Sequence, residues 1–300
     1  MSTFRLAHLS DPHLAPPPQR ASLRDLVSKR LLSRISWRRK RVHAHRPEVL
    51  AAIVADLAGQ APDHIAITGD LTNFSAPEEF AAARLWLESL GDARGVTVSP
   101  GNHDALVARG GGERFATWTP WLGDAGHARF PQARIRGPVA VVNLCSATPT
   151  APLLAQGALG GDQIAEAASL LEALGGQGLF RVVLVHHPIS GGVVSGRKAL
   201  TDRAALREVL RTAGAELVLH GHAHEAVMGA VPGPRGPIPV LGAPSASAIP
   251  DGRHEPARWH MVEIDAQAQG FTVRIIARGF APGSQQIEEL GRYVLPSAQG

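Results

Sequence analysis

Short apolar segments alternate with longer amphipathic segments over the first 219 residues, and this alternation limits the fold more than any other feature. The apolar segments have the length and composition of buried β-strands. Because strand-like and helix-like segments alternate, we expect a largely parallel sheet with helices on its faces. The predicted strands are Phe4–Leu9, His64–Thr68, Gly95–Ser99, Val139–Cys145, Phe180–Val185 and Glu216–Leu219. The predicted helices are Pro47–Ala58, Pro77–Leu90, Gly161–Leu174 and Asp202–Ala213.

The pattern changes after Gly221, where strand-like segments follow one another across turns rich in proline and glycine. This pattern predicts a second, more antiparallel sheet. No polar linker divides the sequence, so we expect residues 1–300 to form a single domain. The strand-like segments of this part are Val227–Val231, Ile238–Gly242, Arg258–Ile264 and Phe271–Ala277.

Composition excludes several classes of protein. A hydrophobic fraction of 44% and 32 glycines are typical of a globular α/β chain and not of a disordered or fibrous one. The single cysteine, Cys145, excludes an internal disulfide and a cysteine-rich zinc site. The first residues lead straight into a strand without an apolar signal segment, and no apolar run is long enough to span a membrane, so we expect a cytoplasmic protein.

Five patches rich in His, Asp and Asn each follow a predicted strand. The carboxyl ends of strands in an open α/β sheet meet at one ligand-binding crevice, so we expect these patches to surround a common point. Nitrogen and oxygen donors without thiolates suit Mn, Fe or Zn better than calcium. The patches are Asp11-Pro12-His13, Gly69-Asp70, Gly101-Asn102-His103-Asp104, His186-His187-Pro188 and Gly221-His222-Ala223-His224.

The residues between the donors carry local signals of their own. Glycines precede Asp70, Asn102 and His222, and we expect them to let the backbone turn tightly where each strand ends. Pro12 predicts an extended backbone at Asp11. Each patch alone is typical of an ordinary turn, whereas five in order behind strands favour a metal site.

In this order the patches resemble the motifs of the calcineurin-like metallophosphoesterases, over residues 11–224. The His-His-Pro and Gly-His-x-His forms are similar to those of the bacterial phosphodiesterase branch, which includes cyclic-nucleotide and glycerophosphodiester hydrolases. The resemblance implies an α/β fold, a calcineurin-like sandwich of two central mixed β-sheets flanked by helices. It also implies a phosphodiester hydrolase with two divalent metal ions, in which a hydroxide bridging the metals is the nucleophile.

The resemblance also implies a role for each donor. Asp11, His13 and His224 would hold the first metal, Asn102, His186 and His222 would hold the second, and Asp70 would bridge the two. A carboxylate suits the bridging role because its two oxygens can span cations roughly 3.5–4 Å apart. His103 has no metal in the family pattern, and it would stabilise the phosphoryl transition state or protonate the leaving oxygen.

Three further residues are predicted to surround the metals or the substrate. Asn73 stands where the Ser/Thr phosphatase branch has an acidic residue that orients the catalytic histidine, which disfavours a protein-phosphatase function. The Asn73 amide would instead accept a hydrogen bond or touch the substrate. We expect His187 to pack beside the ligands, and Asp104 to form a turn or to accept a hydrogen bond behind them.

Residues 20–46, which we call the basic insertion, carry ten basic side chains and one acidic side chain, a charge of +9 against −5 for the rest. Leu23, Val27, Leu31 and Ile35 recur every four residues, which predicts a helix with one apolar face. This helix either lies at the mouth of the site and binds an anionic lipid headgroup, a membrane surface or a large polyanionic substrate, or packs on the domain with a solvated basic face. Nucleic acid is not favoured, because aromatic-rich basic grooves and zinc-finger spacings are absent from the sequence.

The sequence is compatible with two classes of substrate. The first is a phosphodiester hydrolysed in the cytoplasm. The alternative is a nucleotide–lipid diphosphate such as UDP-diacylglucosamine, cleaved by a pyrophosphatase peripheral to the inner membrane face. A non-catalytic metal-bound scaffold is disfavoured because Asp70 and His103 are both present. The sequence also lacks the Gly-x-x-x-x-Gly-Lys-Ser/Thr loop and the Gly-x-Ser-x-Gly elbow of other enzyme classes.

Overall fold

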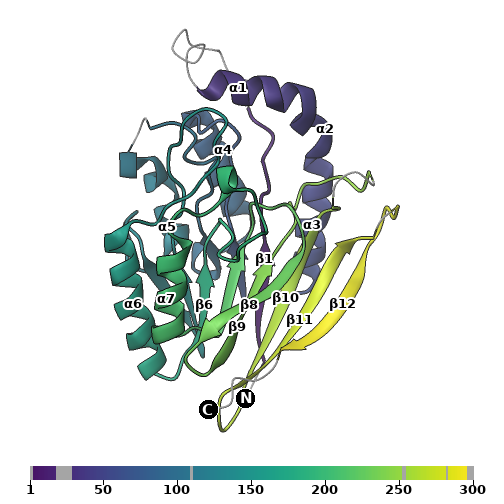
Figure 1. Cartoon of the computed structure of the whole chain (residues 1–300). Helices are drawn as coiled ribbons and strands as arrows, with labels where there is room; N and C mark the ends of the chain where they lie inside the picture. The colour runs from purple at the N-terminus through teal and green to yellow at the C-terminus, as the bar shows by residue number, and fades with distance from the viewer. Residues whose placement is uncertain (1–2, 18–28, 109–110, 252–254, 282, 296–300) are drawn as a thin grey trace.

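The computed structural model describes residues 3–17, 29–108, 111–251, 255–281 and 283–295. Two six-stranded sheets form the centre, with strand orders β12-β11-β10-β1-β2-β3 and β4-β5-β6-β7-β9-β8. Both sheets contain parallel and antiparallel pairs, and helices cover their outer faces (Figure 1). The predicted sandwich of two mixed sheets flanked by helices is therefore confirmed.

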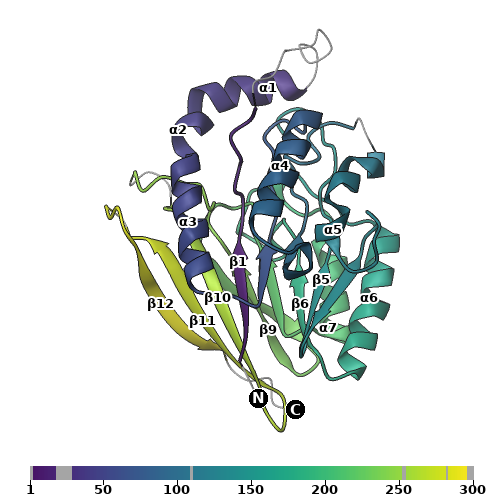
Figure 2. The same ribbon diagram turned by 180° about the vertical axis from the view of Figure 1, so that it is seen from behind.

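The first sheet is built around β1, which pairs in parallel with β2 and antiparallel with β10. Its strands are β1 (Phe4–Leu9), β2 (His64–Ile67), β3 (Val96–Val98), β10 (Arg258–Ala266), β11 (Phe271–Phe280) and β12 (Ile287–Leu295). The helices α3 (Pro47–Gly59) and α4 (Pro77–Ser89) lie over its outer face (Figure 2). Leu50 and Ile53 of α3 and Phe80 and Leu87 of α4 are buried in the apolar cluster on this face.

The second sheet has the parallel strands β5, β6, β7 and β9 at its centre and an antiparallel strand at each edge. Its strands are β4 (Gln132–Arg136), β5 (Val139–Asn143), β6 (Phe180–Leu184), β7 (Leu217–His220), β8 (Val227–Gly233) and β9 (Gly236–Gly242). The helices α6 (Gly161–Gly176) and α7 (Arg203–Ala213) bury Leu171 and Leu206 against it. The short helix α5 (Thr119–Leu122) precedes β4.

One apolar cluster joins the two sheets. It contains Leu6 and Val262 from the first sheet and Val182 and Leu219 from the second, and all four are fully buried. A shared cluster of this kind supports the expectation of one domain, which stays a prediction.

The predicted strands and helices are present, with ends that differ by at most three residues. The expectation that all segments after Gly221 form one sheet is wrong. Strands β8 and β9 extend the second sheet beside β7, whereas β10, β11 and β12 extend the first sheet beside β1. The pattern of apolar residues shows that a strand exists, but it does not show which sheet edge the strand pairs with.

Strand β4 is one of the elements that the sequence pattern does not predict. Its sequence, Gln132–Arg136, contains two arginines and a glutamine. Arg134 is nevertheless buried, and its guanidinium donates hydrogen bonds to the carbonyls of Pro120 and Gly123. Because backbone carbonyls replace water around this cation, the polar segment can enter the sheet.

Residues 29–44 of the basic insertion are helical. They consist of α1 (Lys29–Ser36), a π-helical turn (Trp37–Arg41) and α2 (Val42–Ala44), and they lead into α3. Figure 1 shows α1 and α2 over the end of the molecule opposite the chain termini. Leu23 and Val27 lie outside the described residues. Within the described ranges, no helix combines the length and the apolar character needed to cross a membrane.

Candidate metal centre

The predicted donors converge at the carboxyl ends of parallel strands. Asp11 follows β1, Asp70 follows β2, Asn102 follows β3, His186 follows β6 and His222 follows β7, each within four residues of the end of its strand. Parallel strands end at the same edge of a sheet, so residues far apart in sequence meet there. These five residues and His13 are buried, whereas the remaining predicted ligand, His224, is partly exposed.

Four donors surround a first position. His224 Nε2 lies 3.1 Å from Asp11 Oδ1 and 3.3 Å from His13 Nε2. His13 Nε2 lies 3.9 Å from both Asp11 Oδ1 and Asp70 Oδ2. Donor atoms that each lie about 2.0–2.2 Å from one cation are separated from one another by distances like those just given. These four residues therefore fit a metal ion.

Three more residues surround a second position together with Asp70. His186 Nε2 lies 3.5 Å from Asp70 Oδ2 and 3.2 Å from Asn102 Oδ1. The ligand atoms of Asp70, His186 and His222 all lie within 4.8 Å of one another. Asp70 Oδ2 therefore faces donors of both groups, which is the arrangement that a bridging carboxylate requires.

Unusual backbone conformations concentrate at these donors. Eight non-glycine residues in the described part of the chain have positive φ, and five of them are predicted ligands: Asp11, His13, Asp70, His222 and His224. Left-handed conformations cost non-glycine residues free energy and collect at functional sites. The expectation that Pro12 keeps Asp11 extended is wrong, because Asp11 has a φ of 49°.

Two glycines next to the donors are required by close packing. A side chain at Gly101 would collide with the Asp70 carboxylate, and one at Gly221 would collide with Ser10 and with Asp11 Oδ2. Neither glycine has a positive φ, so the reason for glycine here is space rather than a tight turn. Gly69, with a φ of 91°, combines both reasons, because a Cβ there would also meet His186.

Asp104 joins two of the strand-end loops. Its carboxylate accepts hydrogen bonds from the backbone N–H groups of Gly101 at 2.8 Å, Asp70 at 3.0 Å and Thr72 at 2.8 Å. Burial, followed by the charge of Asp70, raises the pKa of Asp104 to about 7, while these donors oppose the rise. Asp104 therefore accepts hydrogen bonds behind the ligands and holds the loop after β3 against the loop after β2.

His187 lies beside the second group of donors without joining it. Its Nδ1 is 2.7 Å from Ser146 Oγ, and its Nε2 is 3.2 Å from the carbonyl of Ala155. Its ring centroid is 4.4 Å from that of His222. Burial, followed by the neighbouring His186, lowers the pKa of His187 to about 3, so this imidazole is neutral at pH 7.

His103 is oriented by backbone groups. Its N–H donates to Asp70 Oδ1 at 2.7 Å, and its Nδ1 lies 2.9 Å from the carbonyl oxygen of Asn73. The amide of Asn73 points elsewhere, since its Nδ2 donates to the carbonyl of Leu14 at 2.7 Å. The contact predicted between the Asn73 side chain and His103 is therefore made by the main chain. Burial, followed by the nearby Arg41 cation, lowers the pKa of His103 to about 4.

Two residues of the basic insertion reach the donors, and the strand-end pattern predicts neither. Arg41 Nη1 lies 3.1 Å from His103 Nδ1. The His45 ring lies 4.6 Å from that of His13 and 5.4 Å from that of His224, measured between centroids. His45, His13 and His224 could together hold a metal ion. No strand precedes Arg41 or His45, so the only sequence signal is the clustering of charge around them.

A groove of about 660 Å³ opens beside these residues. It runs between the basic insertion and α3, and His13, His45, Trp37, Leu50 and Trp86 are among its lining residues. Its walls are largely apolar, so an organic group attached to a bound phosphate could lie in it.

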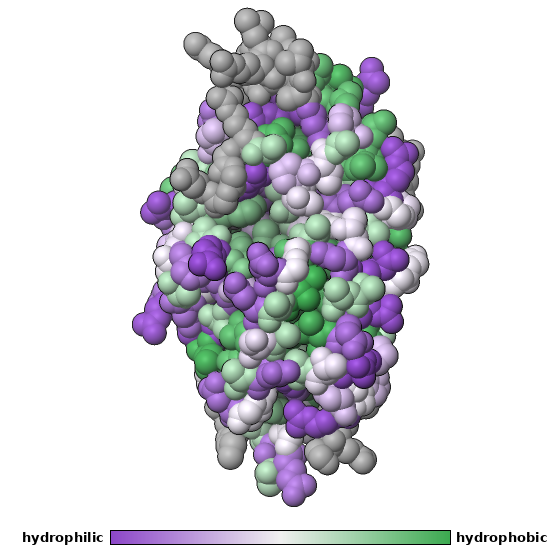
Figure 3. Space-filling model, turned by 60° about the vertical axis from the view of Figure 1, so that its left-hand side comes forward, coloured by the Kyte–Doolittle hydropathy of each residue, from purple (hydrophilic) through white to green (hydrophobic). Residues whose placement is uncertain are grey.

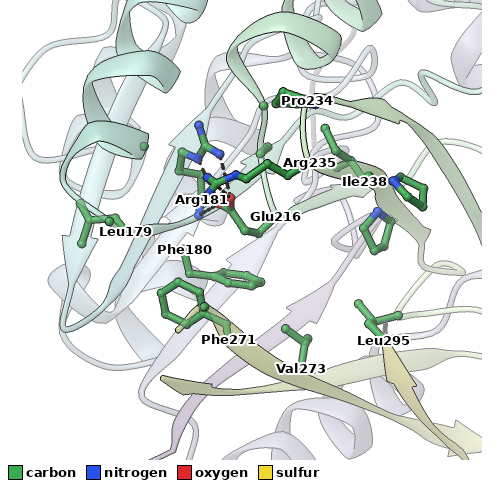
Figure 4. A pocket seen from close by; sticks show the side chains of 18 residues that line it. Leu179, Phe180, Arg181, Glu216, Pro234, Arg235, Ile238, Phe271, Val273 and Leu295 are labelled. Carbon is green, nitrogen blue, oxygen red and sulfur yellow. Dashed lines mark hydrogen bonds and ion pairs between the residues drawn. The ribbon is translucent and has the colours of Figure 1, made fainter. Parts of the chain in front are cut away.

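A smaller cavity of about 180 Å³ lies far from the donors (Figure 4). Arg181 and Glu216 form a bidentate ion pair on its wall, with an Nη2–Oε1 distance of 2.7 Å, and Arg235 approaches the same carboxylate. Arg181 precedes His186 by five residues along β6, which separates them by roughly 16 Å at about 3.3 Å per residue. Because its charges are already paired, this cavity offers no free group for chemistry.

A model of the calcineurin-like phosphoesterases matches residues 4–226, a span that contains every donor described above. The chain belongs to this family. It is a metal-dependent phosphoric ester hydrolase, and the fold and the Asp/His clusters are those that this activity requires.

Individual relatives agree with the family. The chain is 28% identical over 266 residues to a probable cyclic nucleotide phosphodiesterase of Synechococcus, with 88% of each protein covered. Among solved structures, a dimetal phosphatase from Danio rerio has a TM-score of 0.53 at 12% identity, covering 92% of this chain and 95% of that one. A purple acid phosphatase from yellow lupin has a TM-score of 0.61 at 11% identity, covering 98% of this chain and 53% of that one. At these identities the two structures support the fold.

Proposed function

We propose that the protein hydrolyses a phosphodiester with two divalent metal ions, drawn from Mn, Fe and Zn. The observation that carries this proposal is the place of Asp70, whose Oδ2 lies 3.9 Å from His13 Nε2 and 3.5 Å from His186 Nε2. The ions, when bound, would supply a hydroxide nucleophile at neutral pH and neutralise charge on the phosphate oxygens. The first ion would be held by Asp11, His13, Asp70 and His224, and the second by Asp70, Asn102, His186 and His222.

His103 is the proposed catalytic side chain. A carbonyl oxygen can only accept a hydrogen bond, so the contact with Asn73 requires a proton on Nδ1 of His103. This tautomer leaves Nε2 for the substrate. Burial and the nearby Arg41 lower the pKa of His103, so the free ring is neutral, and the negative charge of a bound phosphate would favour its protonation. In the protonated ring, Nε2 would donate to a phosphoryl oxygen or to the leaving oxygen, which is the role of a general acid.

The proposed substrate is a diester with one organic group beside the metals. The relative from Synechococcus is named as a probable cyclic nucleotide phosphodiesterase, which supports a nucleotide diester as one candidate here. The largely apolar groove next to His13 and His45 offers room for a base or another flat organic group. The absence of an acidic side chain at Asn73 disfavours a protein phosphatase.

A lipid-linked diphosphate, cleaved at the inner membrane face, is the second candidate. Leu32 and Ile35 of α1 are 46% and 40% exposed, and Arg38 and Arg39 are exposed in the next turn. Figure 3 shows apolar surface at the end of the molecule where α1 lies. Exposed apolar and basic side chains together suit an anionic membrane surface. Lys29 and Arg30, however, donate to groups of the protein itself.

An activity panel with added Mn²⁺ tests the proposal and separates the two candidates. The substrates are bis-p-nitrophenyl phosphate, p-nitrophenyl phosphate, cyclic AMP and UDP-diacylglucosamine. We expect the diesters to be cleaved faster than the monoester. A preference for the monoester would contradict a phosphodiesterase, and a preference for UDP-diacylglucosamine, together with binding to anionic vesicles, would establish the second candidate instead.

A further inference from the structure

The basic insertion places a cation directly in the proposed catalytic site. Arg41 ends the π-helical turn Trp37–Arg41, and its Nη1 lies 3.1 Å from Nδ1 of His103. Burial lowers the pKa of the Arg41 guanidinium, and the nearby charges of Asp70 and Asp11 oppose this shift. Arg41 is therefore a partly buried cation that shares the surroundings of His103 and of two proposed metal ligands.

Contacts at both ends of the described part of the insertion, residues 29–46, fix the position of Arg41. Where this part begins, Lys29 Nζ donates to Leu154 O at 2.7 Å, and Arg30 Nη2 donates to Ser75 O at 2.6 Å. At its end, the N–H of Arg46 donates to Ser247 O at 2.9 Å. These bonds fasten the helices to loops that flank the donors, and Arg41 lies between the two attachments.

Arg41 lacks a permanent anionic partner. It makes no ion pair with any carboxylate in the part of the chain that the structure describes, and its hydrogen bond there is the contact with His103. A guanidinium has five N–H donors. Buried arginines in folded proteins normally pair with carboxylates or carbonyls, as Arg134 does with the carbonyls of Pro120 and Gly123. Arg41 differs from that pattern.

The contact with His103 does not provide a lasting hydrogen-bond acceptor for the Arg41 guanidinium. The carbonyl of Asn73 accepts only from a protonated Nδ1, whereas a guanidinium can donate only to an unprotonated Nδ1. The two neighbours of Nδ1 therefore require different tautomers of His103. In the tautomer that presents Nε2 to a substrate, His103 donates to Asn73, and Arg41 then has no hydrogen-bond acceptor among the described residues.

We propose that Arg41 binds a non-bridging oxygen of the substrate phosphate beside His103, so that the basic insertion is part of the active site. The proposal rests on the phosphoesterase function proposed above. A diester phosphate gains negative charge on its equatorial oxygens as the nucleophile attacks, and an arginine fork matches two such oxygens in geometry and charge. Arg41 thus adds a fixed cation that acts more strongly in the transition state than in the ground state.

Neighbouring arginines provide matched controls. Arg38 and Arg39 belong to the same π-helical turn and are exposed, so Arg38→Gln and Arg39→Gln remove the same charge away from the donors. In Arg41→Gln, we expect kcat/KM for bis-p-nitrophenyl phosphate to fall about 10²-fold, mainly through kcat. The inhibition constant of inorganic phosphate should rise about tenfold, while metal content and melting temperature stay at wild-type values. The two controls should match wild type in every measurement.

Two outcomes would overturn the proposal. One is an Arg41→Gln protein that keeps its metals, its kcat/KM and its affinity for phosphate. The other is an equal loss in Arg38→Gln or Arg39→Gln, which would reveal a general charge effect. If Arg41→Gln does not fold, Arg41→Lys is measured instead, because lysine keeps the charge and lacks the guanidinium fork. A kcat/KM and an affinity for phosphate below those of wild type would support the proposal, and wild-type values of both would reject it. Calorimetric binding of inorganic phosphate to the metal-loaded protein needs no turnover, so failure of this inference is distinguishable from failure of the diesterase function.

Discussion

The metal donors and the basic insertion meet at the same point by different physical routes. The donors follow strands β1, β2, β3, β6 and β7, so the edge of each sheet determines where their side chains lie. Arg41 and His45 follow no strand, and they reach the site because side chains such as Arg30 fasten α1 to loop carbonyls. A strand-end residue can therefore be placed from the sequence, whereas the position of an inserted residue depends on tertiary contacts.

The two regions should therefore fail in different ways. Five of the seven proposed ligands hold left-handed conformations, and Asp104 joins the loops after β2 and β3 through backbone hydrogen bonds. A change there should alter metal binding. A change at Arg41 should lower the turnover of the diester and the affinity for inorganic phosphate, and it should leave the metals in place. Substitutions that mix these two effects would break the distinction.

The largest effect is expected for Asp70→Ala. No other described carboxylate faces both donor groups, so this variant should lose at least one metal ion and nearly all hydrolytic activity. Elemental analysis of the purified variant measures the loss. Two tightly bound ions per chain in Asp70→Ala would remove Asp70 from the bridging role.

A large effect without metal loss is expected for His103→Ala. Its side chain contacts the Asn73 carbonyl and Arg41 and makes none of the proposed metal bonds. Turnover should fall roughly 10²–10⁴-fold, as for loss of a general acid, while both ions remain. Loss of an ion in this variant would instead identify His103 as a ligand.

A small effect is expected for Asn73→Ala. The variant keeps the backbone carbonyl that orients His103 and loses the buried hydrogen bond from Nδ2 to Leu14 O. The free energy of unfolding should fall by about 1 kcal/mol, and kcat/KM should change by less than about threefold. Thermal unfolding and diester kinetics are the two measurements, and a loss of activity as large as that of His103→Ala would place the amide at the substrate.

The strand-end part of the site was accessible from the sequence because its signals are local. Apolar segments mark the strands, and a ligand such as Asp70 stands directly behind one of them. The contact of the Asn73 main chain with His103 has no local signal, and the only sequence signal for the position of Arg41 is the clustering of charge around it. Both depend on which surfaces pack together, as does the choice of β1 as the partner of β10. Pairing edges and docked helices are properties of the assembled fold.

Anomalous diffraction from crystals of the metal-loaded protein would show whether two ions share the Asp70 carboxylate. Data collected above and below the absorption edges of Mn, Fe and Zn would locate and identify the ions. We predict two peaks roughly 3.5–4 Å apart, with the Asp70 carboxylate between them. One peak should lie among Asp11, His13 and His224, and the other beside His186. A single peak, or peaks that Asp70 does not join, would contradict a binuclear phosphoesterase centre.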